Sequence, residues 1–505
     1  MSRNPALIAS AFFMATVSLL LAGGCPTNES PPPSDDSDEP SGQIEEKTRH
    51  EKIFTEIIPE GFLATSDCLL CHADEGLELL ARGHFTWGDT TDRVAGLEDS
   101  VIGKINLINN FCIAVPSNEG RCTQCHPSFG WKANTAASFF EEINNIDCLV
   151  CHDTTGTYVK HPSANGGGGP PATRVDGQPT VIAVSELQEV AYNVGKPTAR
   201  NCGACHFFAG GGDNVKHGDM GSSLANATTD IDVHLGGQAF ACQTCHQASS
   251  HGISGMQTHS FDEGGASPRC ERCHDQATVH AASMVGEVIE FHLDRVACET
   301  CHLPAFSRTQ PTMVEWYWDE AGQDISPIPT DEFGKPTYDK LKGRFVWATN
   351  VRPAYHWSNG KWNRKVIGLS DTYTEAGTPE DPILLAAPTA TAADADAKVY
   401  PFKLMRGRQP VDPVNKRVVV PHLFGTGPGL ANPYWAGFDW ALAIAEGTAY
   451  AGQEYSGTYG FANTAMYYPV THEIPPASQA LDCGDCHGQP EFWQQLGIED
   501  PFEAF

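Results

Sequence analysis

The chain has 505 residues, and its 32 lysines and arginines against 62 aspartates and glutamates give a formal net charge of −30. This charge argues against nucleic acid as a partner and repels small anions at long range, so any anionic substrate needs a local basic pocket. The length suffices for two or three ordinary domains, and 49 glycines with 35 prolines indicate many turns.

The N-terminus has the pattern of an export signal. Arg3 precedes an apolar stretch over residues 6–22, too short for a comfortable membrane span, which ends in Gly23-Gly24-Cys25. We expect residues 1–24 to be a signal peptide and the product to be an exported periplasmic or outer-membrane lipoprotein, touching the membrane only through a lipid on Cys25. The residues before Cys25 resemble the cleavage motif of bacterial lipoproteins but depart from it at Ala22. Ordinary cleavage nearby would instead give a soluble product. Residues 26–50 are rich in Pro, Ser, Asp and Glu, which predicts a disordered acidic tether over 25–55.

One pattern, Cys-x-x-Cys-His, recurs eight times. Two thiols at this spacing reach both vinyl groups of one porphyrin, and the adjacent histidine is the proximal iron ligand, so the pattern is the attachment motif of c-type haem. Disulfides or zinc knuckles would explain one copy but not a histidine after every pair. The sequence therefore predicts eight haem c groups. The cysteine pairs are Cys68/Cys71, Cys122/Cys125, Cys148/Cys151, Cys202/Cys205, Cys242/Cys245, Cys270/Cys273, Cys298/Cys301 and Cys483/Cys486, and the proximal histidines are His72, His126, His152, His206, His246, His274, His302 and His487.

Eight porphyrins supply much of the apolar core, so the chain need only wrap and ligate them. We expect a multihaem cytochrome c fold, mainly α with long loops and little β, wrapped around a haem stack. Residues 56–302 would form the core with seven motifs and the active site. Residues 303–480, which lack cysteine, would form a haem-free cover, and residues 481–505 the eighth motif and the C-terminus. In the cover, Lys361, Arg364 and Lys365 make a small basic patch that could help an anion approach.

Twelve histidines outside the motifs can supply distal ligands. A second strong ligand makes a haem an electron carrier, whereas an open or displaceable position permits chemistry. Context sets aside His50 in the tether and His161 before a glycine-rich loop, and keeps His259, His356 and His422 in reserve. Seven expected ligands for eight haems leave one iron short, so a ligand other than histidine is worth seeking. The expected distal histidines are His84, His217, His234, His251, His280, His292 and His472.

Six stretches carry a family resemblance. They are residues 109–119 around Cys112, 148–158, 201–207, the sequence GGGDNVKHGD at 210–219, 312–322 with Trp-Tyr-Trp, and the last motif with its preceding His472. Together they resemble the octahaem cytochromes of the tetrathionate reductase family, over about residues 60 to 490.

The resemblance implies that one haem, on the second motif, has a lysine on its distal side. It also implies a pocket with a cysteine and an aspartate three residues before that lysine. Asp213-x-x-Lys216 has this spacing, and Cys112 lies ten residues before Cys122. The resemblance thus implies Lys216, Asp213 and Cys112 as catalytic residues, with Lys216 also a distal iron ligand. An amine binds iron only when neutral. Lys160 is the rival lysine.

Two classes of function remain open. The resemblance implies a reductase that passes electrons to the lysine-ligated haem and reduces tetrathionate, nitrite or hydroxylamine. The alternative is an electron conduit or nanowire subunit, which predicts eight bis-histidine haems and no active pocket. Hydroxylamine oxidation would need a tyrosine linked to a haem, and none is identifiable. Expected partners are redox proteins or quinol-linked cytochromes and a small anionic or N-oxide substrate; a homo-oligomer or filament is compatible with the sequence.

Overall fold

The computed structural model describes residues 49–59, 62–131, 133–159, 172–175, 178–181, 184–255 and 268–499. The signal peptide, Cys25 and most of the tether lie outside the described residues, as do Lys160, His161 and His259, so the expectations for them stay predictions. From residue 47 onward the chain forms one compact unit. No helix in the described ranges combines the length and apolar composition that a bilayer crossing requires.

Short helices carry the haem motifs, as expected. The first helix, α1, begins at Arg49, inside the segment expected to be tether, because Phe54 and the following Ile58 pack into a buried cluster with Leu187 and Val190 of α7. The acidic composition of the tether therefore does not extend to disorder over residues 49–55. The helices up to the seventh motif are α1 Arg49–Ile57, α2 Thr65–Leu69, α3 Ala73–Leu80, α4 Gly83–Thr86, α5 Glu119–Cys122, α6 Leu149–His152, α7 Val184–Tyr192, α8 Ala199–His206, α9 Cys242–Cys245, α10 Gly286–Glu290 and α11 Cys298–His302.

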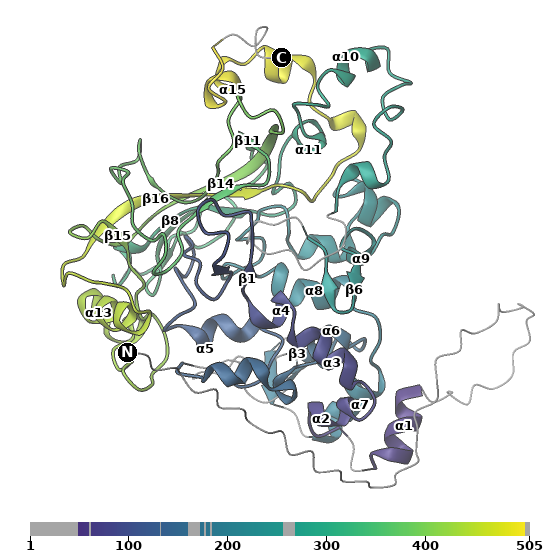
Figure 1. The fold of residues 1–505 in the computed structure, drawn as a ribbon, viewed down its shortest axis with the longest axis vertical. Coiled ribbons are helices and arrows are strands. Elements are labelled where there is room, and N and C mark those ends of the chain that lie inside the picture. The colour runs from purple at the N-terminus through teal and green to yellow at the C-terminus, as the bar shows by residue number, and fades with distance from the viewer. Residues whose placement is uncertain are drawn as a thin grey trace, which may run out of the picture. The chain divides into compact units, whose positions relative to one another are not determined.

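The expectation of little β structure is wrong. In the haem-free stretch, nine strands form a mixed sheet in the order β12-β13-β16-β14-β8-β10-β9, with β11 and β15 also paired to β14. Aromatic and β-branched side chains there build a core of their own without porphyrin. In Figure 1, β8, β14 and β16 run together, and the helices α3, α6 and α8 lie below them, of which α6 and α8 carry motif residues. The strands of this sheet are β8 Thr312–Tyr317, β9 Tyr338–Asp339, β10 Gly343–Ala348, β11 Ala354–Ser358, β12 Trp362–Arg364, β13 Ile383–Pro388, β14 Lys398–Asp412, β15 Arg417–Val418 and β16 Gly460–Pro469.

The remaining elements are short. Three small antiparallel sheets lie among the motif helices. In the described part of the chain, two helices lie between the last two strands of the main sheet and two more follow its last strand. The eighth motif forms one of the latter two. These elements are β1 Asp89–Thr90, β2 Val101–Ile102, β3 Tyr158–Val159, β4 Ala172–Val175, β5 Gln178–Val181, β6 Ala248–Ser249, β7 Gly252–Ile253, α12 Tyr434–Gly437, α13 Trp440–Tyr450, α14 Cys483–His487 and α15 Pro490–Gln495.

The large sheet holds the two loops that carry the predicted catalytic residues. Phe111 and Val215 belong to the same buried cluster as Trp318. The Trp318 indole N–H donates to the Phe111 carbonyl at 2.8 Å, and the Asn110 amide donates to the Met405 carbonyl on β14 at 2.8 Å. The stretch expected as a cover is therefore the scaffold that positions Cys112 and Lys216.

Candidate haem ligands and active site

Seven motif histidines each face a second histidine ring, with ring centroids 6.1 to 6.4 Å apart. A metal–imidazole bond is about 2 Å long, so two imidazoles on one iron hold their centroids about 6 Å apart once the ring radii are added. The spacing therefore fits an iron between each pair of rings. The pairs are His72–His50, His152–His251, His206–His84, His246–His472, His274–His234, His302–His280 and His487–His292.

The space between these rings suits porphyrins. A cavity of about 2290 Å³ runs through the protein and is lined by at least one cysteine from each of the first seven motifs. The eighth motif lies at the C-terminal end, where the His487 ring packs 5.2 Å from that of Trp493. Cysteines, paired imidazoles and room therefore come together at six motifs. The eighth has its cysteines and paired imidazoles outside the described lining of this cavity, and the second motif requires separate description.

One of the seven pairs contains a histidine that was not expected as a ligand, and the expectation for His217 stays a prediction. Helix α1 brings the His50 ring onto His72, whereas the expected His217 packs its ring against Tyr468 at 5.7 Å. The other six expected distal histidines each face a motif histidine. His50 was set aside because an acidic, proline-rich composition surrounds it, and only the packing of α1 on α7 reveals its position.

The backbone of the second motif differs from that of other motifs in the chain. In the first motif the His72 N–H donates to the Cys68 carbonyl, four residues back, at 2.9 Å, and the third, fifth and sixth motifs repeat this bond. In the second, the His126 N–H donates at 3.0 Å to Thr123, only three residues back, in the 3-10 turn Thr123–Cys125. The chain then becomes extended at His126, which redirects the side chain.

The His126 ring turns away from the cavity as a result. It is fully buried, with the indoles of Trp87 and Trp131 at centroid distances of 4.9 and 4.7 Å. Its Nε2 donates to the Phe85 carbonyl, and its Nδ1 lies 2.5 Å from the Ser128 hydroxyl. An iron ligand needs a nitrogen lone pair that is not already engaged. In this conformation His126 lies outside the described lining of the cavity, and its role as proximal ligand stays a prediction.

Lys216 occupies the cavity beside the second motif. Burial lowers the pKa of its amine to about 7, and the nearby charges of Lys104 and Arg364 add to the effect, while Cys125 of the motif opposes it. Near neutral pH, a large fraction of the amine therefore carries a free lone pair. This is the form in which lysine can bind a metal.

The loop around Lys216 lies directly against the loop of Cys112. Gly210 has φ +83°, and a Cβ there would lie 3.1 Å from the Phe111 ring and 3.2 Å from the Lys216 Cβ. From the other side, the Lys403 ammonium on β14 donates to the Val215 carbonyl at 2.6 Å. The glycine and the sheet lysine together fix where Lys216 leaves the backbone.

Cys112 is half-buried next to the second motif and close enough to influence the Cys122 thiol. Burial raises its pKa above the usual value, and the charges of Lys342 and Arg121 only partly oppose this. Cys112 is therefore a protonated thiol near neutral pH. As a thiol it is a weak nucleophile that can donate a hydrogen bond.

Asp213 does not join this pocket. Its Oδ1 accepts from the Ser222 backbone N–H at 2.8 Å and from the Gln310 amide at 3.0 Å, and its Oδ2 accepts from the Ser222 hydroxyl. Its side chain is absent from the described lining of the cavity. In this structure the carboxylate anchors the loop after Lys216, and its catalytic role stays a prediction.

Basic side chains gather where the second motif meets the cavity. Sequence reasoning named only Arg364 of the group outside Lys216, because the others come from loops with no shared motif. The Lys104 ammonium also lies 4.0 Å from the centroid of the Trp87 ring. This is the local positive pocket that an anion would need in so acidic a protein. The group consists of Lys104, Arg121, Lys216, Lys342 and Arg364.

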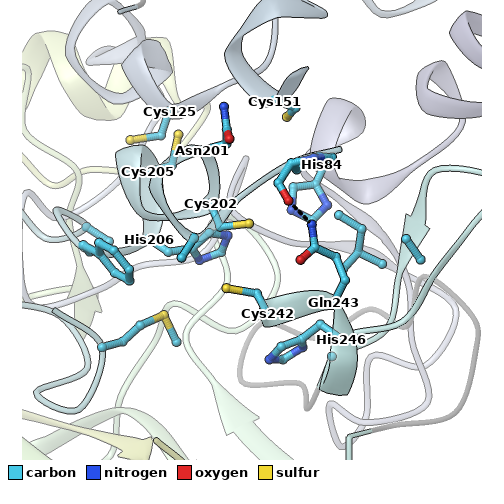
Figure 2. A pocket seen from close by; sticks show the side chains of 18 of the residues that line it. His84, Cys125, Cys151, Asn201, Cys202, Cys205, His206, Cys242, Gln243 and His246 are labelled. Atoms are coloured by element: carbon cyan, nitrogen blue, oxygen red, sulfur yellow. Dashed lines mark hydrogen bonds between the residues drawn. The ribbon is translucent and has the colours of Figure 1, made fainter. Parts of the chain in front are cut away.

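Cysteines of different motifs lie near one another in a definite order. Figure 2 shows Cys125 beside Cys205, and Cys202 on α8 facing Cys242 on α9, where the thiols hydrogen-bond. The order of contact is first, third, fourth, fifth, sixth, seventh and eighth motif, and the second motif branches from the fourth. The further hydrogen-bonded or electrostatic contacts are Cys68–Cys148, Cys151–Cys202, Cys245–Cys273, Cys270–Cys298 and Cys301–Cys483.

Known proteins resemble the chain over different lengths. The family model described as bacterial cytochrome c matches residues 313–490. An uncharacterized protein from Archaeoglobus fulgidus is 24% identical over 266 residues, which are 45% of this chain and 89% of that protein. The crystal structure of an octahaem cytochrome c from Shewanella oneidensis is 37% identical, covers 90% of this chain and 98% of that one, and superposes with a TM-score of 0.75. The chain therefore belongs to the octahaem c-type cytochromes, and the family resemblance found in its motifs is confirmed.

Proposed function

We propose that the chain is an exported reductase with eight haem c groups. Seven motifs with paired histidines would hold haems that carry electrons to a haem on the second motif. Lys216 would be the protein ligand of that haem, where a small sulfur or nitrogen compound would be reduced. One observation carries the proposal. Seven motif histidines face a second histidine, whereas His126 is held by Phe85 and Ser128 and the half-neutral amine of Lys216 lies in the cavity beside Cys125.

The residues fit this role in three ways. A haem on Cys122 and Cys125 would supply electrons and an iron that binds substrate. Lys216 would hold that iron through its neutral amine. Because the His126 ring is turned away, it would not compete with a substrate for the iron.

The surroundings favour a small anion. Lys104 and Arg364 act on Lys216 and line the same cavity, so they oppose the repulsion from the net charge of −30. Cys112 stands beside the pocket as a thiol that can donate a hydrogen bond to a bound oxyanion or sulfur chain. Tetrathionate, a dianion, is split by two electrons without protons, whereas nitrite and hydroxylamine consume protons on reduction. Reduction of tetrathionate therefore requires the least proton transfer from the acid–base groups near Lys216.

The test replaces Lys216 with leucine in the haem-loaded protein. We expect the absorption spectrum of one haem to change and turnover of tetrathionate, nitrite or hydroxylamine to fall by about 100-fold, a loss of about 2.7 kcal/mol in transition-state stabilisation. Lys196→Leu is the matched control, because Lys196 lines the same cavity but is exposed, and it should leave both unchanged. Unchanged turnover in Lys216→Leu would refute the proposed site.

A pure electron conduit is the second candidate. The line of motifs from the first to the eighth, with an exposed Cys483 at its end, would suit transfer between two redox proteins. The two functions separate in one assay. If the reduced wild-type protein turns over none of the three substrates, the conduit explains the chain better, and the branch at the second motif has no catalytic role.

A further inference from the structure

A buried aspartate holds the segment that carries His472. Asp219 is 1% exposed, and its Oδ2 accepts from the backbone N–H groups of Thr471 at 2.6 Å and His472 at 2.9 Å. The same oxygen lies 3.4 Å from the His472 Nδ1. Within the described residues, its Oδ1 has no hydrogen-bond partner. A carboxylate buried beside a ligand histidine is costly, so its position calls for a reason.

Other ligand histidines have weaker partners on Nδ1. Backbone carbonyls stand there for His152 and His246, at 2.8 Å each. The Glu78 carboxylate lies 3.0 Å from the His251 Nδ1, but 38% of its side chain is exposed. Water and salt screen an exposed charge, whereas a charge inside the protein acts at a lower dielectric constant. A second buried carboxylate, Asp232, is 3% exposed and lies 3.8 Å from the His234 Nδ1, but its two oxygens accept from three backbone N–H groups. Asp219 lies closer to its histidine, at 3.4 Å, and accepts from only two backbone N–H groups.

A carboxylate in this position acts on iron in two ways. As hydrogen-bond acceptor from Nδ1, it makes the imidazole donate more electron density to the iron. As a negative charge, it favours the ferric state, which has one more positive charge than the ferrous state. Lys403 lies close enough to interact with Asp219, but burial lowers the pKa of its amine to about 7, and the amine donates to the Val215 carbonyl at 2.6 Å and the Thr312 hydroxyl at 2.7 Å. Lys403 therefore offsets only part of the charge that Asp219 places beside His472.

We propose that Asp219 is a positioning residue that orients His472 and lowers the reduction potential of the haem of the fifth motif. The proposal rests on the haem pairing of the proposed function but not on its substrate. The fifth motif lies next to the fourth through Cys202–Cys242 and next to the sixth through Cys245–Cys273. Asp219 would therefore set the potential of a haem that electrons cross on their way between the fourth and sixth motifs.

The test is a spectroelectrochemical titration of the eight-haem protein and two variants. Asp219→Asn keeps an oxygen for the two backbone N–H groups and removes the charge. It should raise one midpoint potential by at least about tenfold in the equilibrium constant, which is about 59 mV for one electron. Thr471→Val removes the neutral hydroxyl 3.0 Å from the His472 Nδ1 and leaves Asp219 as the acceptor, so it should leave that potential unchanged or lower it.

The pair of variants makes the proposal refutable. No shift in a folded Asp219→Asn protein that retains eight haems by mass would overturn it. A rise of the potential in Thr471→Val would also overturn it, even if Asp219→Asn fails to fold, because the hydroxyl would then be the true acceptor. Glu78→Gln, at the exposed carboxylate, should shift its own haem by less than Asp219→Asn does. None of these readouts uses a substrate, so they stand apart from the Lys216→Leu test.

Discussion

Gly210→Ala tests the contact that sets Lys216 against the Cys112 loop. The new Cβ would lie 3.1 Å from the Phe111 ring and 3.2 Å from the Lys216 Cβ, against about 3.5–4.0 Å for an ordinary carbon contact. One of the neighbours must therefore move by a few tenths of an ångström. A 1 Å misplacement costs about 100-fold in rate, so on a logarithmic scale this shift should lower turnover roughly fourfold. The left-handed φ of +83° adds about 1–2 kcal/mol of strain to the folded state.

The matched control is Gly211→Ala. Gly211 also has a left-handed φ, +96°, but a Cβ there meets nothing within 4 Å. Denaturant unfolding should show a similar loss of stability in both variants. Turnover with a reduced viologen dye as electron donor, and the spectrum of the lysine-ligated haem, should change only in Gly210→Ala. Equal turnover in the two variants, or a spectral change in Gly211→Ala alone, would refute the positioning argument.

Three further predictions concern single residues. His50→Ala should turn one low-spin haem high-spin in an electron paramagnetic resonance spectrum, whereas His217→Ala should not; the reverse would restore His217 as the ligand. Because burial raises the pKa of Cys112, its thiolate fraction at pH 8 is below that of a free cysteine, so iodoacetamide should modify it at least several-fold more slowly than glutathione, as mass spectrometry can measure. Equal rates would contradict the burial argument. Cys25→Ser should release the protein from membranes, and a wild type that is soluble and begins at another residue would exclude the anchor.

Local sequence was sufficient wherever the chemistry is local. Cys-x-x-Cys-His places two cysteines and a histidine within five residues. All eight motifs, and with them the seven motif histidines that face a second ring, could therefore be identified from the pattern. Lys216, too, was identified from a short segment that resembles the family and has its spacing of aspartate and lysine. In the structure Lys216 lines the cavity. The hydrogen bonds of Asp213 could not be predicted in the same way, because its partners Ser222 and Gln310 lie up to 97 positions away in the chain.

Long-range packing decided the rest. His50 reaches His72 only because α1 packs on α7, and no periodicity in an acidic segment reveals that contact. The large sheet was missed because reasoning from porphyrins assumed that they supply the core everywhere, whereas β8 and β14 build one from Trp316, Phe402 and their neighbours. The His126 side chain is redirected because its backbone N–H donates to the residue three positions back instead of four. The motif itself does not encode this difference.

The iron of the second motif in the haem-loaded protein tests the central claim most directly. A crystal structure would measure its distances to the Lys216 Nζ and to the His126 ring. We predict Nζ at about 2 Å from that iron, with the His126 ring still bonded to the Phe85 carbonyl and the Ser128 hydroxyl. A His126 nitrogen bound to the iron, or Lys216 beyond bonding distance of it, would contradict the account.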